Sequence, residues 1–162
     1  QDADGFLNAY RFLARLPRYF RPDQVIVTDA GTAAMAGHAV MRVVPPQRFG
    51  FSFNLGEMGW GMPGAVGASF ATGRGEVVCL NCDGSMMMNL QELQTIAHHK
   101  LPIKIVVISN EAYSSIKLSQ RNLFQGRLAG SDPSSGVSCP DFLKVAGAFG
   151  LLMPSVALLV GG

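Results

Sequence analysis

The sequence predicts an α/β fold, a doubly wound parallel sheet covered by helices on both faces to give three layers. Apolar runs at residues 25–29, 76–82 and 103–109 have the length and composition of buried strands. Segments with helical spacing of apolar residues separate them, as is typical of parallel strands joined by crossover helices. Ligands bind such sheets at the carboxyl ends of the strands, so the residues after each run are the first candidates for a functional site.

Apolar spacing and the positions of Gly and Pro define the other elements in chain order. Residues 5–20 place apolar side chains at helical intervals, which predicts a first helix. One more strand is predicted at residues 48–53, and further helices at residues 31–41, 60–71, 85–99, 113–124 and 142–150. Residues 125–140 are rich in Gly, Ser and Pro, so we expect a long loop there.

Composition indicates one soluble domain with enough chain for a sizeable core, since 48% of the 162 residues are hydrophobic and 15% are charged. Lys and Arg are scattered, which argues against a nucleic-acid partner. No apolar run approaches the roughly 20 residues that span a bilayer, so no membrane partner is expected. Three cysteines and no visible signal peptide favour a reducing, cytoplasmic location. Cys79 and Cys82 would point to opposite faces of one strand, which argues against a redox pair.

Polar side chains follow two neighbouring predicted strands. Asp83 comes directly after residues 76–82, and Asn110 follows residues 103–109. A βαβ unit would bring both to one sheet edge, where oxygen ligands suit Mg²⁺ that also contacts phosphate. Gly84 would let the backbone approach an anion, and Ser85 lies where a helix begins, with free N–H groups facing outward. From these residues alone, a strand-to-helix turn with an Asp N-cap and an unrelated Asn remains an alternative.

The spacing resembles the motif of thiamine diphosphate-dependent enzymes, in which Gly-Asp-Gly is followed some two dozen residues later by Asn-Asn. Here Cys82 replaces the first Gly and Ser109 the first Asn. The resemblance implies that Mg²⁺ is held by Asp83, Asn110 and the main-chain carbonyl of Ala112, so neither replacement removes a ligand. Residues 86–93 and 101–108 closely resemble acetolactate synthase-like members, and the resemblance extends over residues 25–150.

A Gly-rich segment at residues 55–68 also resembles this family. By resemblance, Met58 lies under the cofactor, its main-chain carbonyl accepts a hydrogen bond from the aminopyrimidine, and Gly56 leaves space beside it. The residues alone are also consistent with a Gly-rich loop leading into a buried helix. Gly31 and Thr32 fit the turn that contacts the diphosphate, although any strand-turn-helix would look alike.

Three further residues are candidates for the substrate pocket. Of Tyr113, Ser115 and Gln120, only Tyr113 matches a common family position closely. The loop at residues 125–140 either closes over the active centre or is a surface connection, and the sequence leaves both open. The tail at residues 151–162 departs from the charged helix and terminal strand usual in the family, as a truncated or diverged domain would.

The resemblance implies a thiamine diphosphate-binding fold, with residues 1–162 forming the diphosphate-binding domain, as a fragment or one part of a larger enzyme. The implied reaction is decarboxylation of a 2-oxo acid followed by transfer to an acceptor carbonyl, a lyase and transferase chemistry. No catalytic residue is assigned, because the activating Glu of the family lies on a pyrimidine-binding domain. That domain or subunit is the expected partner, in a homo-oligomer, and the chain alone is expected to be inactive.

Two alternatives to this function remain. One is a simple non-oxidative 2-oxo acid decarboxylase with the two domains on separate subunits. The other is a non-catalytic nucleotide-binding α/β module that uses Asp83 only as an N-cap. The substrate and acceptor stay open.

Overall fold

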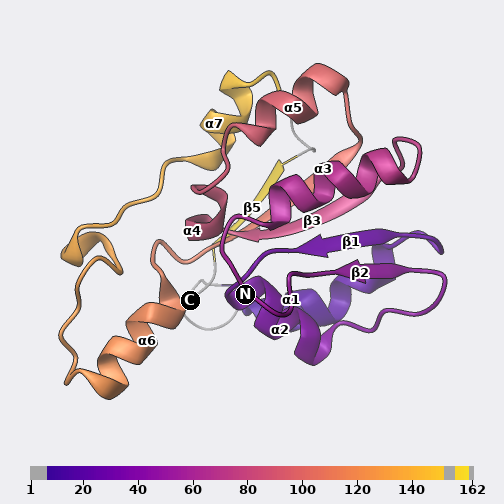
Figure 1. Cartoon of the computed structure of the whole chain (residues 1–162). Helices are drawn as coiled ribbons and strands as arrows, with labels where there is room; N and C mark the ends of the chain where they lie inside the picture. The colour runs from indigo at the N-terminus through magenta and orange to yellow at the C-terminus, as the bar shows by residue number, and fades with distance from the viewer. Residues whose placement is uncertain (1–6, 152–155, 161–162) are drawn as a thin grey trace.

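The computed structural model describes residues 7–151 and the backbone of residues 156–160. These residues form a parallel five-stranded sheet in the order β2-β1-β3-β4-β5 (Figure 1). The strands are β1 (Val25–Thr28), β2 (Arg48–Gly50), β3 (Val77–Cys82), β4 (Ile103–Ser109) and β5 (Val156–Val160). The predicted doubly wound α/β fold is confirmed.

Helices cover both faces of the sheet. They are α1 (Ala9–Arg15), α2 (Thr32–Val40), α3 (Gly61–Ala71), α4 (Asp83–Met86), α5 (Glu92–His99), α6 (Ser114–Leu123) and α7 (Phe142–Ala148), with 3₁₀ turns η1 (Leu16–Tyr19) and η2 (Pro133–Ser135). The α1 and α2 side shares one apolar core, and α3, α5 and α7 share the other. Cys79 belongs to the second core and Cys82 to the first, so the prediction that they lie on opposite faces is confirmed.

The direction of winding reverses between β1 and β3. From β1 the chain crosses to β2 on one side, and then returns to β3 on the other side of β1. The loops that follow β1 and β3 therefore leave the sheet in opposite directions. Such a switch point is where open α/β sheets bind their ligands.

Two predicted elements are shorter than expected. The helix predicted at residues 5–20 is an α-helix only from Ala9 to Arg15, because Pro17 in the following 3₁₀ turn lacks the N–H that would continue the helix. Residues 1–6 lie outside the described part of the chain. The strand predicted at residues 48–53 ends at Gly50.

The single helix predicted at residues 85–99 is wrong. α4 ends at Met86 and α5 begins at Glu92, with a turn at residues 87–91 between them. In this turn the Asn89 side chain donates a 2.6 Å hydrogen bond to the carbonyl oxygen of Gly59. A tertiary contact therefore accompanies the break in a segment whose apolar spacing is helical.

The tail contributes a strand. Val156–Val160 pairs in parallel with residues 105–109 of β4 and adds the fifth strand of the sheet. Residues 152–155 and 161–162 are outside the described ranges. Among the residues that are described, no helix combines the length and the apolar character needed to cross a membrane.

Candidate functional site

A cavity of about 260 Å³ opens at the carboxyl ends of β1, β3 and β4. Every residue that the sequence suggested for cofactor or metal binding contributes to its lining: Gly31, Thr32, Gly56, Met58, Asp83, Gly84, Ser85, Asn110, Ala112 and Tyr113. They come from four separate segments, which the fold brings together at the switch point of the sheet. Their binding roles stay predictions, but their convergence is a property of the structure.

Asp83 ties the ends of β3 and β4 together. One carboxylate oxygen, Oδ2, accepts hydrogen bonds from the Asn110 N–H (2.8 Å), the Glu111 N–H (2.7 Å) and the Ser109 hydroxyl (3.2 Å). The other oxygen, Oδ1, accepts one from the Gly84 N–H at 2.8 Å. A carboxylate oxygen can accept more than one bond, so Oδ1 keeps capacity for a cation. Asp83 thus has a structural role in addition to its predicted metal role.

Asn110 carries an unpaired buried oxygen. Its Oδ1 is shielded from solvent and has no hydrogen-bond partner among the described residues. A buried polar atom without a partner costs about 1–3 kcal/mol, so this oxygen is available to a group bound in the cavity. Asn110 and Asp83 line the same cavity, and Glu111, at φ 54°, forms the left-handed turn that follows Asn110. That conformation is uncommon for a residue with a side chain and is typical of functional turns.

The donor set fits a hard cation. Carboxylate, side-chain amide and main-chain carbonyl oxygens are available from Asp83, Asn110 and Ala112 around one cavity. Within the described ranges, no three His, Cys, Asp or Glu side chains gather as a transition-metal site would require. Mg²⁺ needs few protein oxygens because phosphate and water complete its octahedral shell. The residues present therefore fit the predicted magnesium-diphosphate group.

Backbone N–H groups line another part of the cavity. α2 begins after Gly31, whose φ of 78° favours glycine and which has no side chain to cap the helix. The N–H of Ala33 in the first turn donates to the sulfur of Cys82 at 3.3 Å. Burial raises the pKa of the Cys82 thiol to about 12, with the charges of Asp83 and Asp29 adding to it. The thiol therefore stays neutral beside this helix end at physiological pH.

Gly84 is required by the side chains around it. A Cβ atom at this position would overlap ring atoms of Tyr113 and would lie 3.1 Å from the Cε atom of Met58. The residues of three motifs, from β3, from the Gly-rich segment and from the start of α6, therefore contact one another at a single point. This close packing explains why the small residue stands beside the Asp.

Sequence reasoning missed several lining residues. Ala30 and Cys82 directly precede predicted residues, Met35 lies one helical turn after Thr32, and Ser114 and Ile116 lie in the first turn of α6. Ser115 lines the cavity as suggested. The suggestion that Gln120 faces the pocket is wrong, because its amide bonds with Ala129 and Ser131 in the following loop instead.

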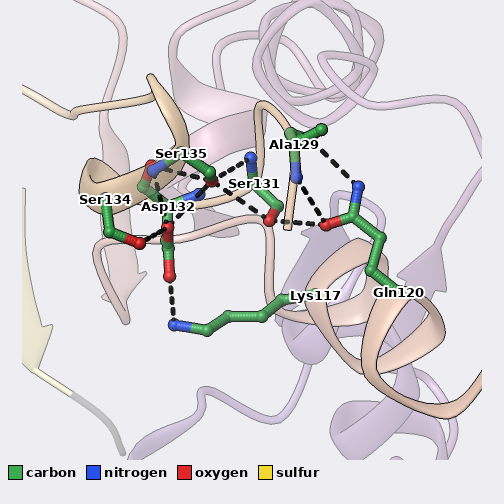
Figure 2. A network of polar contacts seen from close by, with 7 residues as sticks. All are labelled: Lys117, Gln120, Ala129, Ser131, Asp132, Ser134 and Ser135. Atoms are coloured by element: carbon green, nitrogen blue, oxygen red, sulfur yellow. Dashed lines mark hydrogen bonds and ion pairs between the residues drawn. The ribbon is translucent and has the colours of Figure 1, made fainter. Parts of the chain in front are cut away.

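The loop after α6 is fastened to that helix by a polar network (Figure 2). The ammonium group of Lys117 lies 2.6 Å from the Asp132 carboxylate, which also accepts bonds from Ser134 and Ser135. The pKa of Asp132 is held well below its usual range, mainly by the hydrogen bond from Lys117 and then by the hydrogen bonds from Ser134 and Ser135. The Tyr113 N–H donates to the carbonyl of Ser131 at 2.8 Å, so the network connects the loop directly to the cavity wall.

Comparisons with known proteins point to one family. The family described as thiamine pyrophosphate enzyme, C-terminal TPP binding domain, matches residues 29–156. The chain is 40% identical over 129 residues to the acetolactate synthase isozyme 2 large subunit of Escherichia coli K12, which covers 80% of the chain. It is 37% identical over 134 residues to the acetolactate synthase large subunit of Parasynechococcus marenigrum, which covers 83% of the chain.

The fold is also found in a solved structure. A thiamine diphosphate-dependent 4-hydroxybenzoylformate decarboxylase of Rhodococcus jostii RHA1 matches 96% of the chain with a TM-score of 0.79, at 22% identity. The chain spans 23% and 21% of the length of the two acetolactate synthase subunits, and 32% of the decarboxylase chain. From the family match over residues 29–156 and the identity to these subunits, the chain belongs to the thiamine pyrophosphate enzyme family, as a C-terminal TPP binding domain.

Proposed function

We propose that this domain binds Mg²⁺ and the diphosphate of thiamine diphosphate in an acetolactate synthase-like enzyme that decarboxylates a 2-oxo acid and transfers the product to an acceptor carbonyl. The observation that carries the proposal is the unpaired, buried Oδ1 of Asn110 in the cavity that Asp83 also lines. When bound, thiamine diphosphate supplies the electron sink for cleaving a bond next to a carbonyl group. The relatives named as acetolactate synthases support this reaction class.

The chain's own residues divide into three roles. Asp83, Asn110 and the carbonyl of Ala112 hold the metal ion. Small residues at the starts of α2 and α4 surround the diphosphate, and all of them line the cavity: Gly31, Thr32, Gly84 and Ser85. Helix starts suit this task because their free N–H groups and positive dipole ends attract anions.

The remaining lining residues would meet the organic part of the cofactor. Met58 and Gly56 form one wall and Tyr113 another, and the three come together around Gly84. We assign to Met58 a supporting role beneath the cofactor, with its main-chain carbonyl accepting from the aminopyrimidine. Tyr113 covers the backbone of Gly84 and limits the access of water to the metal end.

The mouth of the cavity favours a protein partner. Two apolar residues that line the cavity, Met35 and Ile116, are 65% and 44% exposed. Close to Gly56 in the sequence, Phe53 and Leu55 are 79% and 82% exposed. Exposed apolar side chains in such number suit an interface. We assign that interface to a pyrimidine-binding domain or subunit, which supplies the activating Glu, in a cytoplasmic homo-oligomer. On this account the chain alone does not turn over.

Calorimetry with thiamine diphosphate tests the proposal. Binding to the full-length protein is expected to require Mg²⁺ and to weaken strongly in Asn110→Ala, which removes a metal ligand. Asp83→Ala should also abolish binding, but it leaves the Asn110 and Glu111 N–H groups without their acceptor and so disturbs the turn as well. Gln94→Ala, an exposed change on α5, is the control.

Two results would contradict the proposal. One is an absence of Mg²⁺-dependent binding by the full-length protein, and the other is unchanged affinity in Asn110→Ala. Product analysis with pyruvate then separates the reactions, because a carboligase gives acetolactate whereas a simple decarboxylase gives acetaldehyde.

A further inference from the structure

The loop after α6 turns back and meets the first turn of that helix. The ammonium group of Lys117 lies 2.6 Å from the Asp132 carboxylate (Figure 2). The N–H of Tyr113, the residue before the helix, donates to the carbonyl of Ser131 at 2.8 Å. Resting on the proposed function, we propose that Lys117 and Asp132 are positioning residues, whose ion pair fixes Tyr113 and thereby slows the release of bound Mg²⁺ and thiamine diphosphate. Neither side chain of this pair lines the cavity.

Tyr113 is the part of the cavity wall that the loop holds. Its ring lies against Gly84, where a Cβ atom would overlap it. The Gly84 N–H donates to Asp83 Oδ1 at 2.8 Å, so the ring packs beside the predicted metal ligand. Both main-chain polar groups of Tyr113 are bonded, because its carbonyl accepts from the Lys117 N–H at 2.8 Å and its N–H is taken by Ser131. The place of the ring therefore depends on α6 and on the loop together.

The peptide group that accepts from Tyr113 is held at both ends. It joins Ser131, which is fully buried, to Asp132. Its carbonyl accepts from the Tyr113 N–H, and its own N–H donates to the Ser135 hydroxyl at 2.9 Å. That hydroxyl also lies 2.8 Å from Asp132 Oδ1, while Lys117 takes Oδ2. A shift of the Asp132 carboxylate would therefore move the carbonyl on which Tyr113 depends.

The ion pair is the charged link between loop and helix. The side chains of Lys117 and Asp132 are only 25% and 8% exposed, so water screens their attraction less than that of a surface pair. Gln120, one turn further along α6, adds neutral bonds, accepting from the Ser131 hydroxyl at 2.8 Å and donating to the Ala129 carbonyl at 2.9 Å. Charge-assisted bonds are the stronger kind, so the Lys117 contact is the one to remove.

A double-mutant comparison in the full-length protein tests the positioning role. Lys117→Met removes the ammonium group and keeps a long side chain on the helix. It should weaken binding of thiamine diphosphate with Mg²⁺ about fivefold by calorimetry, the effect of roughly one hydrogen bond, and release after chelation with EDTA should be faster by a similar factor. In the Tyr113→Ala background the same substitution should change the affinity less than about twofold, because the ring that it positions is gone.

Two further variants serve as controls. Lys117→Arg keeps the charge and should retain most of the affinity. Lys144→Met removes a lysine whose side chain is 87% exposed and pairs with Asp141 at 3.6 Å, and it should leave cofactor binding unchanged.

Hydrogen exchange of the Tyr113 amide reports the same link without any cofactor. The bond to Ser131 protects this amide, so it should exchange about tenfold faster in Lys117→Met, while the amides of β3 and β4 keep their protection. Mass spectrometry of peptides that contain Tyr113 measures the change. Where Tyr113→Ala binds the cofactor too weakly for comparison, this measurement decides alone.

The outcomes separate the inference from the proposed function. Equal losses of affinity with and without the Tyr113 ring would overturn the positioning role, because the charge of Lys117 would then act directly on the diphosphate. Unchanged affinity or unchanged exchange in Lys117→Met would overturn it as well. Failure of the unmodified protein to bind thiamine diphosphate would overturn the proposed function instead. If Lys117→Met does not fold, Gln120→Ala serves in its place, because it loosens the same loop.

Discussion

Gly84 lies in van der Waals contact with the ring of Tyr113 and near the methyl group of Met58. Gly84→Ala should therefore push the ring aside and reduce thiamine diphosphate affinity by about fivefold or more, since an overpacked contact costs about 1–3 kcal/mol. The Tyr113→Ala variant makes room for the new methyl group. Calorimetry should show that Gly84→Ala costs much less in the Tyr113→Ala background, and additive losses would show that the ring contact is not the cause.

Cys82 carries a thiol in the cavity wall, yet it should not react. Burial raises its pKa to about 12, and that of the less buried Cys139 to about 11. The reactive thiolate forms only as pH approaches these values, whereas unfolded cysteines titrate near about 8.5. Iodoacetamide at pH 7.5 should leave both residues unmodified in the folded protein and label them in denaturant, as counted by mass spectrometry. Rapid labelling of native Cys82 would contradict this assignment.

Asp83 and Asn110 could be predicted because both directly follow apolar strands, and parallel pairing leaves little freedom in where such residues lie. The contacts of Asp29 and Asn89 could not be predicted in the same way. Both side chains bond to Gly59, which lies 30 residues from each of them in the sequence. The prediction that Gln120 faces the pocket failed for the same reason, because its side-chain amide bonds to Ala129 and Ser131 in a loop that follows later in the chain.

Along α3, neighbouring glycines have different surroundings. Gly67 has open space where a Cβ would lie, whereas a Cβ on Gly64 would be 3.0–3.2 Å from the Trp60 ring. Gly67→Ala should raise the free energy of unfolding by about 0.5–1 kcal/mol, because alanine loses less backbone entropy in a helix. Gly64→Ala should gain little or lose stability. Urea unfolding compares the two, and an equal gain would show that the Trp60 contact adjusts without cost.

The loop after α6 should respond to acid through Asp132. Its pKa is lowered chiefly by Lys117, so the ionised form stabilises the folded state. This stabilisation is complete above the unfolded pKa of about 3.9 and is lost as pH falls toward the lower folded value. The difference in unfolding free energy between the unmodified protein and Asp132→Asn should therefore be largest near pH 7 and shrink below about pH 4. A difference that does not depend on pH would contradict the role of the charge. In the Lys117→Met background, the effect of Asp132→Asn should be largely lost.

The α4–α5 turn shows why helix boundaries were the least predictable feature. The apolar spacing of residues 85–99 is helical, and two short helices overlap this range, α4 at its start and α5 at its end. What interrupts them is a donor needed by Gly59, which local spacing does not encode. The α6 helix, by contrast, was predicted closely, although in the described part of the chain it contributes no buried residue.

For the molecule as a whole, β5 completes the sheet on the side of β4. A chain ending at Leu151 would leave the edge of β4 unpaired along residues 105–109, directly before Asn110. Exposed strand edges promote association. We expect this truncation to lower the unfolding midpoint and to increase aggregation, measured by thermal denaturation with light scattering. An unchanged midpoint would show that β5 adds little to the sheet.

The parallel sheet and the position of the cavity were predictable together, because apolar strands alternating with helices indicate a parallel sheet and ligands bind at the carboxyl ends of its strands. The fifth strand was not predicted, although Val156–Val160 has the apolar composition of a strand. Residues 151–162 do not resemble the charged helix and terminal strand usual in the family, so the resemblance did not indicate a strand here.

The two hydrogen bonds on Gly59 also constrain the order of folding. Each closes a loop of 30 residues, one reaching back to Asp29 and one forward to Asn89. A single hydrogen bond offsets little of the entropy of closing such a loop, whereas β1 and β3 pair along four residues, so the Met58 segment should become ordered after these strands have paired. By the same logic, a substitution at Asp29 or Asn89 would release this segment while the strands stay paired. The result would be a folded domain in which the Met58 segment no longer supports the cofactor.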